Sequence, residues 1–282
     1  MGLFTFLAKR FIAGETKEEA FGAVRRLNNM GMRTTLDILG ENVTSEKMAR
    51  DLADSYIELV EAIDKDKLTA NVSVKLTQMG LDVSDDFCFG NVSGIIEAAG
   101  ARNIFVRIDM EGSDYTKRTL QLVYRWAEKY DNVGTVIQAM LHRSEADIRE
   151  LIRRRIRVRL CKGAYKEPPS VAIQRKEDVN ANYIALMKIL LDSGIFHSIA
   201  THDDAMISAT RDFATIKGIP KSNFEFQMLY GINRSGQTEL VKNGYGMLIY
   251  VPFGTHWFPY YYRRLRERKE NILFIAKHLF KD

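Results

Sequence analysis

The stretch IFVRIDMEGSDYTKRTLQLVYRWAEKYDNVGTVIQ, residues 104–138, contains a strand, a helix and a second strand in succession. Ile104–Asp109 and Gly134–Gln138 are short runs rich in β-branched residues, as strands are. Between them, apolar residues recur every three or four positions along Thr116–Lys129, which is the spacing of an amphipathic helix. A strand followed by a helix and another strand is typical of a parallel sheet that is covered by helices.

The same alternation continues in both directions along the chain. Helical patterns are also found at Thr44–Ala62, Asp178–Ser193 and His256–Arg268. The expected strands are Thr34–Leu39, Val72–Leu76, Ile104–Asp109, Gly134–Gln138, Val158–Cys161, Ser198–Thr201, Phe224–Gln227 and Met247–Val251. Eight such units in succession favour a closed (βα)8 barrel of the TIM type, and a doubly wound sheet is the alternative.

Length and composition suit a single barrel. The chain has 282 residues, of which 46% are hydrophobic, and a barrel of about 250 residues would use nearly all of it. No tract rich in Ser, Gly and Pro divides the chain as a linker would. We expect a short N-terminal helical arm at residues 1–30 and a barrel catalytic domain at residues 31–282.

The basic residues do not predict binding to nucleic acid. Lys and Arg exceed Asp and Glu by 41 to 36, and the excess is spread along the sequence. The densest cluster is RRRIRVR at 153–159, where a solvated helix end explains the first three arginines at least as well as a phosphate track does. Its alternation with apolar residues places Arg157 and Arg159 on one face of a strand, where Arg159 needs an anionic partner.

Cysteine spacing and hydropathy indicate a cytoplasmic protein. Cys88 and Cys161 lie far apart, without the spacing of a disulfide framework or zinc site, and the five histidines have no metal-ligand spacing. No apolar run reaches the roughly 18 residues that span a bilayer. Weak peripheral contact with the inner face of a membrane is expected at most. Its candidate is the apolar stripe at residues 272–280, and docking of that helix on the barrel is the alternative.

Polar side chains stand at the carboxyl ends of seven of the eight predicted strands. They are Lys75, Asp109, Gln138, Arg159 with Lys162, Thr201 with His202, Glu225 with Gln227, and Tyr250. TIM barrels carry their active sites at this end, so we expect one there. No G-x-G-x-x-G or P-loop motif occurs, but the small-residue turn that includes Lys162 offers donors to a phosphate. The residues after Thr201 suit a cation site or a helix N-cap.

A second candidate site lies in WFPYYYRRLRE, residues 257–267. Helical spacing places Tyr260, Arg263, Arg264 and Glu267 on one face. Two guanidinium groups beside an aromatic ring can clamp a carboxylate, with the ring packed against an apolar substrate body. An exposed amphipathic helix with an Arg to Glu pair is the alternative.

At these residues the sequence closely resembles the proline dehydrogenase family. The motifs that carry the resemblance are VKLTQ at 74–78, RIDME at 107–111, VIQ at 136–138, RLCKGAY at 159–165, ATHD at 200–203, FEFQMLYG at 224–231, YVPFG at 250–254 and YYYRR at 260–264. They follow the family order along nearly the whole chain after residue 30. Phe253 stands where some members have Tyr, and the segment before the first strand is shorter than in many members.

The resemblance implies a distorted (βα)8 barrel that holds noncovalent FAD, oxidises L-proline to Δ1-pyrroline-5-carboxylate and passes the electrons to a membrane quinone. It implies a monofunctional enzyme, without the added domains of the bifunctional relatives. The alternative from another functional class is a non-catalytic barrel that binds an amino acid or a phosphorylated ligand through Lys75, Arg159 and the Arg263–Arg264 pair.

The resemblance also assigns roles to individual residues. It implies that Lys75, Arg263 and Arg264 bind the proline carboxylate and that Asp109, Tyr250, Leu229 and Tyr260 shape the pocket. The residues that it places in contact with FAD are Met110, Gln138, Arg159, Lys162, Gly163, Ala164, Thr201 and His202. Asp109 and Arg159, the latter close to the isoalloxazine, are its catalytic residues.

Overall fold

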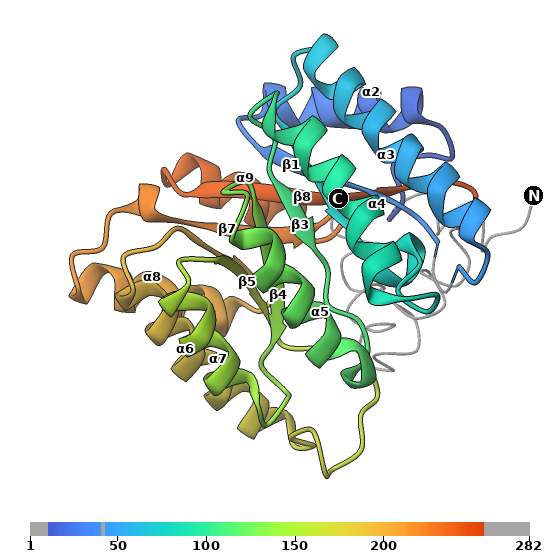
Figure 1. Cartoon of the computed structure of the whole chain (residues 1–282). Helices are drawn as coiled ribbons and strands as arrows, with labels where there is room; N and C mark the ends of the chain where they lie inside the picture. Colours follow the sequence, from blue (N-terminus) through green and yellow to red (C-terminus); the bar gives the residue numbers. More distant parts are fainter. Residues whose placement is uncertain (1–10, 41–42, 257–282) are drawn as a thin grey trace, which may run out of the picture.

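Eight parallel strands follow one another around a closed barrel, with helices on the outside (Figure 1). This computed structural model describes residues 11–40 and 43–256. The strands are β1 (Arg33–Ile38), β2 (Ala70–Val74), β3 (Val106–Ile108), β4 (Val133–Gln138), β5 (Arg157–Cys161), β6 (His197–Ala200), β7 (Phe224–Leu229) and β8 (Gly246–Phe253). Pairing of β8 with β1 closes the sheet. The predicted (βα)8 barrel is therefore confirmed, and the doubly wound alternative is wrong.

Most of the predicted helices are found within a few residues of their expected bounds. The helices are α2 (Lys17–Asn29), α3 (Glu46–Lys65), α4 (Asp85–Gly100), α5 (Ser113–Ala127), α6 (Ser144–Arg153), α7 (Lys176–Asp192), α8 (Asp204–Ile216) and α9 (Arg234–Lys242), with short 3-10 helices η1 (Leu76–Met79) and η2 (Lys221–Asn223). The side chain of Ser45 caps α3 by accepting from the backbone N–H of Met48. The helix expected at His256–Arg268 lies, after its first residue, outside the described residues.

Helix α2 completes the ring of helices between the last strand and the first. Thr16 and Glu19 form a capping box that starts it. Its buried face, which includes Phe21 and Val24, packs against β1 and β8. Just before it, the backbone N–H of Ala13 donates to the carbonyl of Pro252 at 2.9 Å. The described part of the N-terminal arm is thus packed on the barrel wall.

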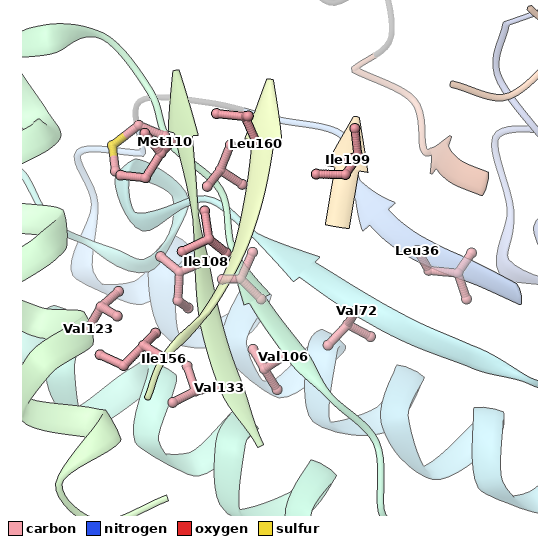
Figure 2. Close-up of a cluster of buried hydrophobic side chains, with 14 of the residues drawn as sticks. Leu36, Val72, Val106, Ile108, Met110, Val123, Val133, Ile156, Leu160 and Ile199 are labelled. Carbon is pink, nitrogen blue, oxygen red and sulfur yellow. The ribbon is translucent and has the colours of Figure 1, made fainter. Parts of the chain in front are cut away.

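The hydrophobic core lies between the strands and the helices. Figure 2 shows Val106, Ile108 and Leu160 in this layer, and all three are fully buried. These side chains occupy alternate positions of their strands, so they share the outward face of the barrel. Burial of such apolar surface, at about 25 cal/mol per Å2, is the main force that holds the helices against the sheet.

The inward face of the strands is polar. Thr35 on β1 and Ser73 on β2 have their hydroxyl oxygens 3.0 Å apart, and Arg159 donates to Ser73 Oγ at 3.1 Å. The interiors of TIM barrels are ordinarily filled by branched apolar side chains. Here polar side chains that hydrogen-bond to one another occupy this part of the interior. Their network continues to the carboxyl ends of the strands.

His197, the first residue of β6, makes the free energy of unfolding depend on pH in the acid range. It is fully buried, and its Nδ1 accepts from the backbone N–H of Val158 at 3.0 Å. Burial, helped by the cations of Arg107 and Arg157, lowers the pKa of His197 from 6.5 to about 3. The folded chain therefore keeps the ring neutral at a pH where the unfolded chain takes up a proton.

We expect the stabilising contribution of neutral His197 to be complete above its unfolded pKa of 6.5 and to be lost as the pH falls from there towards about 3. The loss approaches about 1.4 kcal/mol per pH unit. His197→Asn keeps an acceptor for the N–H of Val158 but does not titrate. Urea unfolding at about pH 7 and about pH 5 should show a smaller decrease for this variant. Equal decreases for variant and wild type would contradict the assignment.

Candidate active site

Four ionisable side chains meet at the carboxyl end of the barrel. Asp37 comes from β1, Lys75 follows β2, Asp109 follows β3, and Tyr250 lies on β8. Closure of the barrel brings β8 beside β1, so residues that are far apart in the sequence become neighbours. The prediction that this end gathers the polar strand-end residues agrees with the structure at Lys75, Asp109 and Tyr250.

Lys75 is the centre of this group. Its Nζ donates to Asp37 Oδ1 at 2.6 Å and to the hydroxyl of Tyr250 at 3.3 Å, and lies 3.9 Å from Asp109 Oδ2. Burial by itself lowers the pKa of Lys75, but the carboxylates of Asp37 and Asp109 raise it above its ordinary value. The ammonium group is therefore held in its charged form, with its donors directed by fixed acceptors.

Asp37 is fully buried beneath Lys75. Burial raises the pKa of Asp37, as does the charge of Asp109, and the attraction of Lys75 only partly offsets these effects. Its Oδ2 has no hydrogen-bond partner among the described residues. Burial of an unpaired carboxylate lowers the stability of the fold, so the ion pair with Lys75 offsets much of the desolvation free energy of Asp37.

Asp109 links the lysine side of the site to the arginine side. Its Oδ1 accepts from Arg159 Nη1 at 2.8 Å, and its Oδ2 accepts from the Tyr250 hydroxyl at 2.8 Å. Both carboxylate oxygens are thus occupied by donors from opposite parts of the barrel. This arrangement fixes the orientation of the Tyr250 ring.

Arg159 on β5 is the predicted cation, and Asp109 is its anionic partner. The same guanidinium donates from Nη2 to Ser73 and from Nε to the side-chain carbonyl of Gln227 on β7. Its charged centre lies 5.4 Å from the centroid of the Tyr250 ring. Acceptors on β2 and β7 and directly after β3 therefore hold one buried guanidinium in a single orientation.

A second set of predicted residues lies beside Arg159, at the ends of β4, β5 and β6. Gln138 donates to the backbone carbonyl of Glu111 at 3.0 Å and accepts from the N–H of Ala164 at 3.3 Å. Lys162 pairs with Asp203 at 2.6 Å. Met110 is buried after β3. The residues predicted for the cofactor are thus brought together by consecutive strands.

The turn after β5 needs a glycine. Gly163 has a φ of +119°, and a Cβ there would lie 2.4 Å from the sulfur of Met140. Glycine is therefore required here both for the positive φ and for the close packing of the Met140 side chain. The next strand ends similarly in Thr201 and His202, where His202 Nε2 accepts from the N–H of Leu229 at 3.1 Å. Asp203 then caps α8, so the N-cap reading of this segment is correct.

Sequence reasoning missed the supporting residues Asp37 and Ser73 and gave Gln227 no role. Asp37 carried a signal, because a carboxylate stands two positions after Thr35 in a run that otherwise suits a buried strand. Of the predicted substrate residues, Lys75, Tyr250 and half-buried Leu229 are described, whereas Tyr260, Arg263 and Arg264 lie outside the described residues.

Comparison with known proteins agrees with this geometry. A family model described as proline dehydrogenase matches residues 20–277. The chain is 41% identical over 274 residues to proline dehydrogenase 1 of Bacillus subtilis, and this match covers 97% of this chain and 91% of the relative. It is 37% identical over 280 residues to the proline dehydrogenase of Deinococcus radiodurans, with coverages of 98% and 90%.

A solved structure has the same fold. Proline utilization A (PutA) from Bdellovibrio bacteriovorus, inactivated by N-propargylglycine, superposes with a TM-score of 0.88 at 29% sequence identity. The match covers 94% of this chain and 33% of that much longer one. The family model and the high coverage of the shorter relatives together show that the chain belongs to the proline dehydrogenase family.

Proposed function

We propose that this protein oxidises L-proline to Δ1-pyrroline-5-carboxylate by transfer of a hydride to noncovalently bound FAD, as the first step of proline catabolism. The observation that carries the proposal is the buried cluster of Lys75, Asp109, Arg159 and Tyr250 at the carboxyl end of the barrel, in a member of the proline dehydrogenase family. The electron acceptor of the reduced flavin is proposed to be a quinone.

The residues beside Arg159 fit a flavin dinucleotide. Bound FAD would accept the hydride and the electrons that go with it. Arg159 and Lys162 supply positive charge, Gln138 and Thr201 supply polar side chains, and the turn at Gly163 supplies backbone donors for a phosphate. Met110, Gly163, Ala164 and His202 complete the proposed contacts. A cation such as Arg159 near a flavin favours its electron-rich reduced form.

The residues around Lys75 fit the substrate. The proline amine must be neutral for its lone pair to stabilise the developing iminium, so the site has to orient the ring and exclude water. Tyr250 and Leu229 are proposed to shape the pocket, together with Tyr260. Lys75, Arg263 and Arg264 are proposed to bind the carboxylate. Because Asp37 and Tyr250 already occupy two donor directions of Lys75, its third N–H remains for the substrate.

Two further proposals concern the chain as a whole. Residues 1–30 are the arm and 31–282 the catalytic domain. Among the described residues, no helix is long and apolar enough to span a bilayer. Access to a quinone in lipid is proposed to use weak peripheral contact. The candidate stripe at residues 272–280 lies outside the described residues, and flotation with liposomes before and after its apolar residues are made polar tests it.

An absorption spectrum tests the function directly. The purified protein, reconstituted with FAD if necessary, should absorb in the visible range, and anaerobic L-proline should bleach this flavin band. A protein that binds proline but takes up no FAD would instead support the alternative of a non-catalytic barrel. FAD uptake without reduction by proline would exclude proline as the electron donor.

Replacement of Arg263 or Arg264 with Met should weaken binding of L-proline. A charge-assisted hydrogen bond contributes about 1.5 to 3 kcal/mol, so KM should rise by roughly ten- to a hundredfold while FAD content stays the same. Pyrrolidine, which lacks the carboxylate, is the control substrate, and its turnover should change much less. Equal losses on both substrates would show that the arginines support the fold or the flavin instead.

A further inference from the structure

The basic run RRRIRVR at 153–159 divides into three parts in the structure. Arg153 is the last residue of α6 and Arg154 is its C-cap, and both pair with Glu150 at 2.6 Å. Arg159 reaches the active site at the opposite end of β5. Arg155 and Arg157 are exposed, and no carboxylate of the described residues lies within ion-pair distance of either guanidinium. These two arginines are not used by the proposed reaction.

Arg155 and Arg157 line one cavity of about 1000 Å3. It lies at the amino ends of β4, β5 and β6, where Val133, Arg157 and Phe196 contribute to its wall, and so at the end of the barrel opposite the active site. Its charged lining residues are Lys129, Arg154, Arg155 and Arg157, against Glu97 and Asp131. Glu97 already accepts from the hydroxyl of Tyr130 at 2.5 Å.

The backbone at Arg155 favours a different residue. Its φ of +58° is in the left-handed region, as at the turns after α2, α7, α8 and α9, which have glycine there, and at the turns after α3 and α4, which have Lys67 and Asn103. A side chain in this conformation costs of order 1 kcal/mol relative to glycine. Arg155 therefore places a cation at the rim of the cavity at some expense of local stability, and the location of this cation, not the backbone conformation that it shares with Lys67, points to a ligand.

Arg157 is held in place by aromatic rings. Its guanidinium lies 5.2 Å from the centroid of Phe105 and 5.8 Å from that of Phe196. Its backbone carbonyl accepts from Arg107 Nη1 at 2.7 Å. Such stacking restricts the side chain without neutralising its charge, so the guanidinium of Arg157 stays available to an anion.

A third guanidinium, that of Arg107, lies next to Arg157. Burial, followed by the cation of Arg159 and then more weakly that of Arg157, lowers the pKa of Arg107 to about 9. The attraction of Glu225 offsets this only in part, and that carboxylate is already paired with Arg33. An anion at the cavity would relieve repulsion among these guanidinium groups.

We propose that this cavity is a binding site for a phosphate group, with Arg155 and Arg157 as its ligands. Phosphate matches the planar donor set of arginine, and two guanidinium groups from one turn can contact the same oxyanion. The group could belong to a free phosphorylated metabolite or to an anionic lipid headgroup. The site is separate from the proposed active site and does not depend on the proposed reaction.

The test uses FAD-saturated protein and inorganic pyrophosphate, titrated by calorimetry at constant ionic strength set with chloride. Wild type should bind, and Arg155→Gly should bind about ten- to a hundredfold more weakly. Glycine suits the left-handed backbone, so this variant should fold at least as well as wild type. Arg157→Met should lose binding similarly. Arg149→Ala removes an exposed charge of α6 that does not line the cavity, so this variant is the matched control and should bind like wild type.

Two arms distinguish the source of the phosphate. In the first arm, wild type and Arg155→Gly are floated with vesicles that contain phosphatidic acid and with vesicles of phosphatidylcholine alone. Flotation of wild type only, and only with phosphatidic acid, would identify a lipid headgroup. Pyrophosphate binding without flotation would identify a free phosphorylated ligand. The proposal is overturned if pyrophosphate does not bind at millimolar concentration, or if it binds wild type, Arg155→Gly and Arg157→Met equally.

Discussion

Replacing Asp37 with alanine should lower the free energy of unfolding by about 3 to 5 kcal/mol, the usual result of breaking a buried ion pair from one side. The side chain of Lys75 is nearly as deeply buried as that of Asp37, and the 2.6 Å contact of its Nζ would be lost. Asp109 at 3.9 Å is the nearest remaining carboxylate, and it is already bonded to Arg159 and Tyr250. The change should be measured by urea unfolding at about pH 7.

An exposed pair of the same length provides the control. Lys47 and Asp51 on α3 are also 2.6 Å apart, but their side chains are 83% and 59% exposed. Asp51→Ala should therefore change the free energy of unfolding by less than about 1 kcal/mol. Equal effects of Asp37→Ala and Asp51→Ala would show that burial does not determine the energetics of the Asp37 pair.

The double variant Asp37→Ala with Lys75→Met separates pairing from packing. Lys75→Met alone leaves the buried Asp37 carboxyl without its ammonium partner, and Asp37→Ala alone leaves the opposite charge. Removal of both charges should recover part of the stability that either single change loses. Activity should not recover, because Lys75 is proposed to contact the substrate. Stability and activity therefore report different roles of the same pair.

The fold could be predicted because each strand is recognisable from its own short sequence pattern. Apolar residues such as Val106 and Ile108 alternate with polar ones such as Arg107, and this pattern marks a short buried strand whatever its neighbours are. The position of Lys75 and Asp109 at the carboxyl end of the barrel could be predicted for the same reason, since both directly follow such a run. The end of a parallel strand, rather than any motif, makes them candidates.

The partners of these residues could not be predicted in the same way, because they depend on barrel closure and strand register. Asp37 meets Lys75 because β1 lies between β2 and β8 with a fixed stagger, and nothing in either strand alone determines that stagger. The bond from Arg159 to Gln227 crosses from β5 to β7. The pair of Lys162 with Asp203 depends on the separation of two loops.

Replacement of Arg159 by another cationic residue should lower activity strongly, because the guanidinium contributes more than its charge. Its Nε, Nη1 and Nη2 donate to Gln227, Asp109 and Ser73 respectively, so each acceptor uses a different nitrogen of one rigid group. Lysine keeps the positive charge but offers a single nitrogen on a flexible chain. Arg159→Lys therefore tests orientation, whereas Arg159→Met tests orientation and charge together.

With the proposed FAD bound, Arg159→Lys should slow anaerobic reduction of the flavin by L-proline by about a hundred- to a thousandfold, the range typical for loss of one preoriented donor. Its flavin reduction potential should stay closer to wild type than that of Arg159→Met, which should fall because the cation that is proposed to favour the reduced form is gone. Arg149→Lys is the matched control, because Arg149 makes two contacts to Glu145 on the exposed face of α6 and should tolerate the change.

A wild-type reduction rate in Arg159→Lys, at full flavin occupancy, would show that charge alone suffices and that the three fixed contacts serve only the fold. A slowed rate with an unchanged potential would instead place the effect in the geometry of proline against the flavin, where Asp109 and Tyr250 depend on the same guanidinium for their orientation.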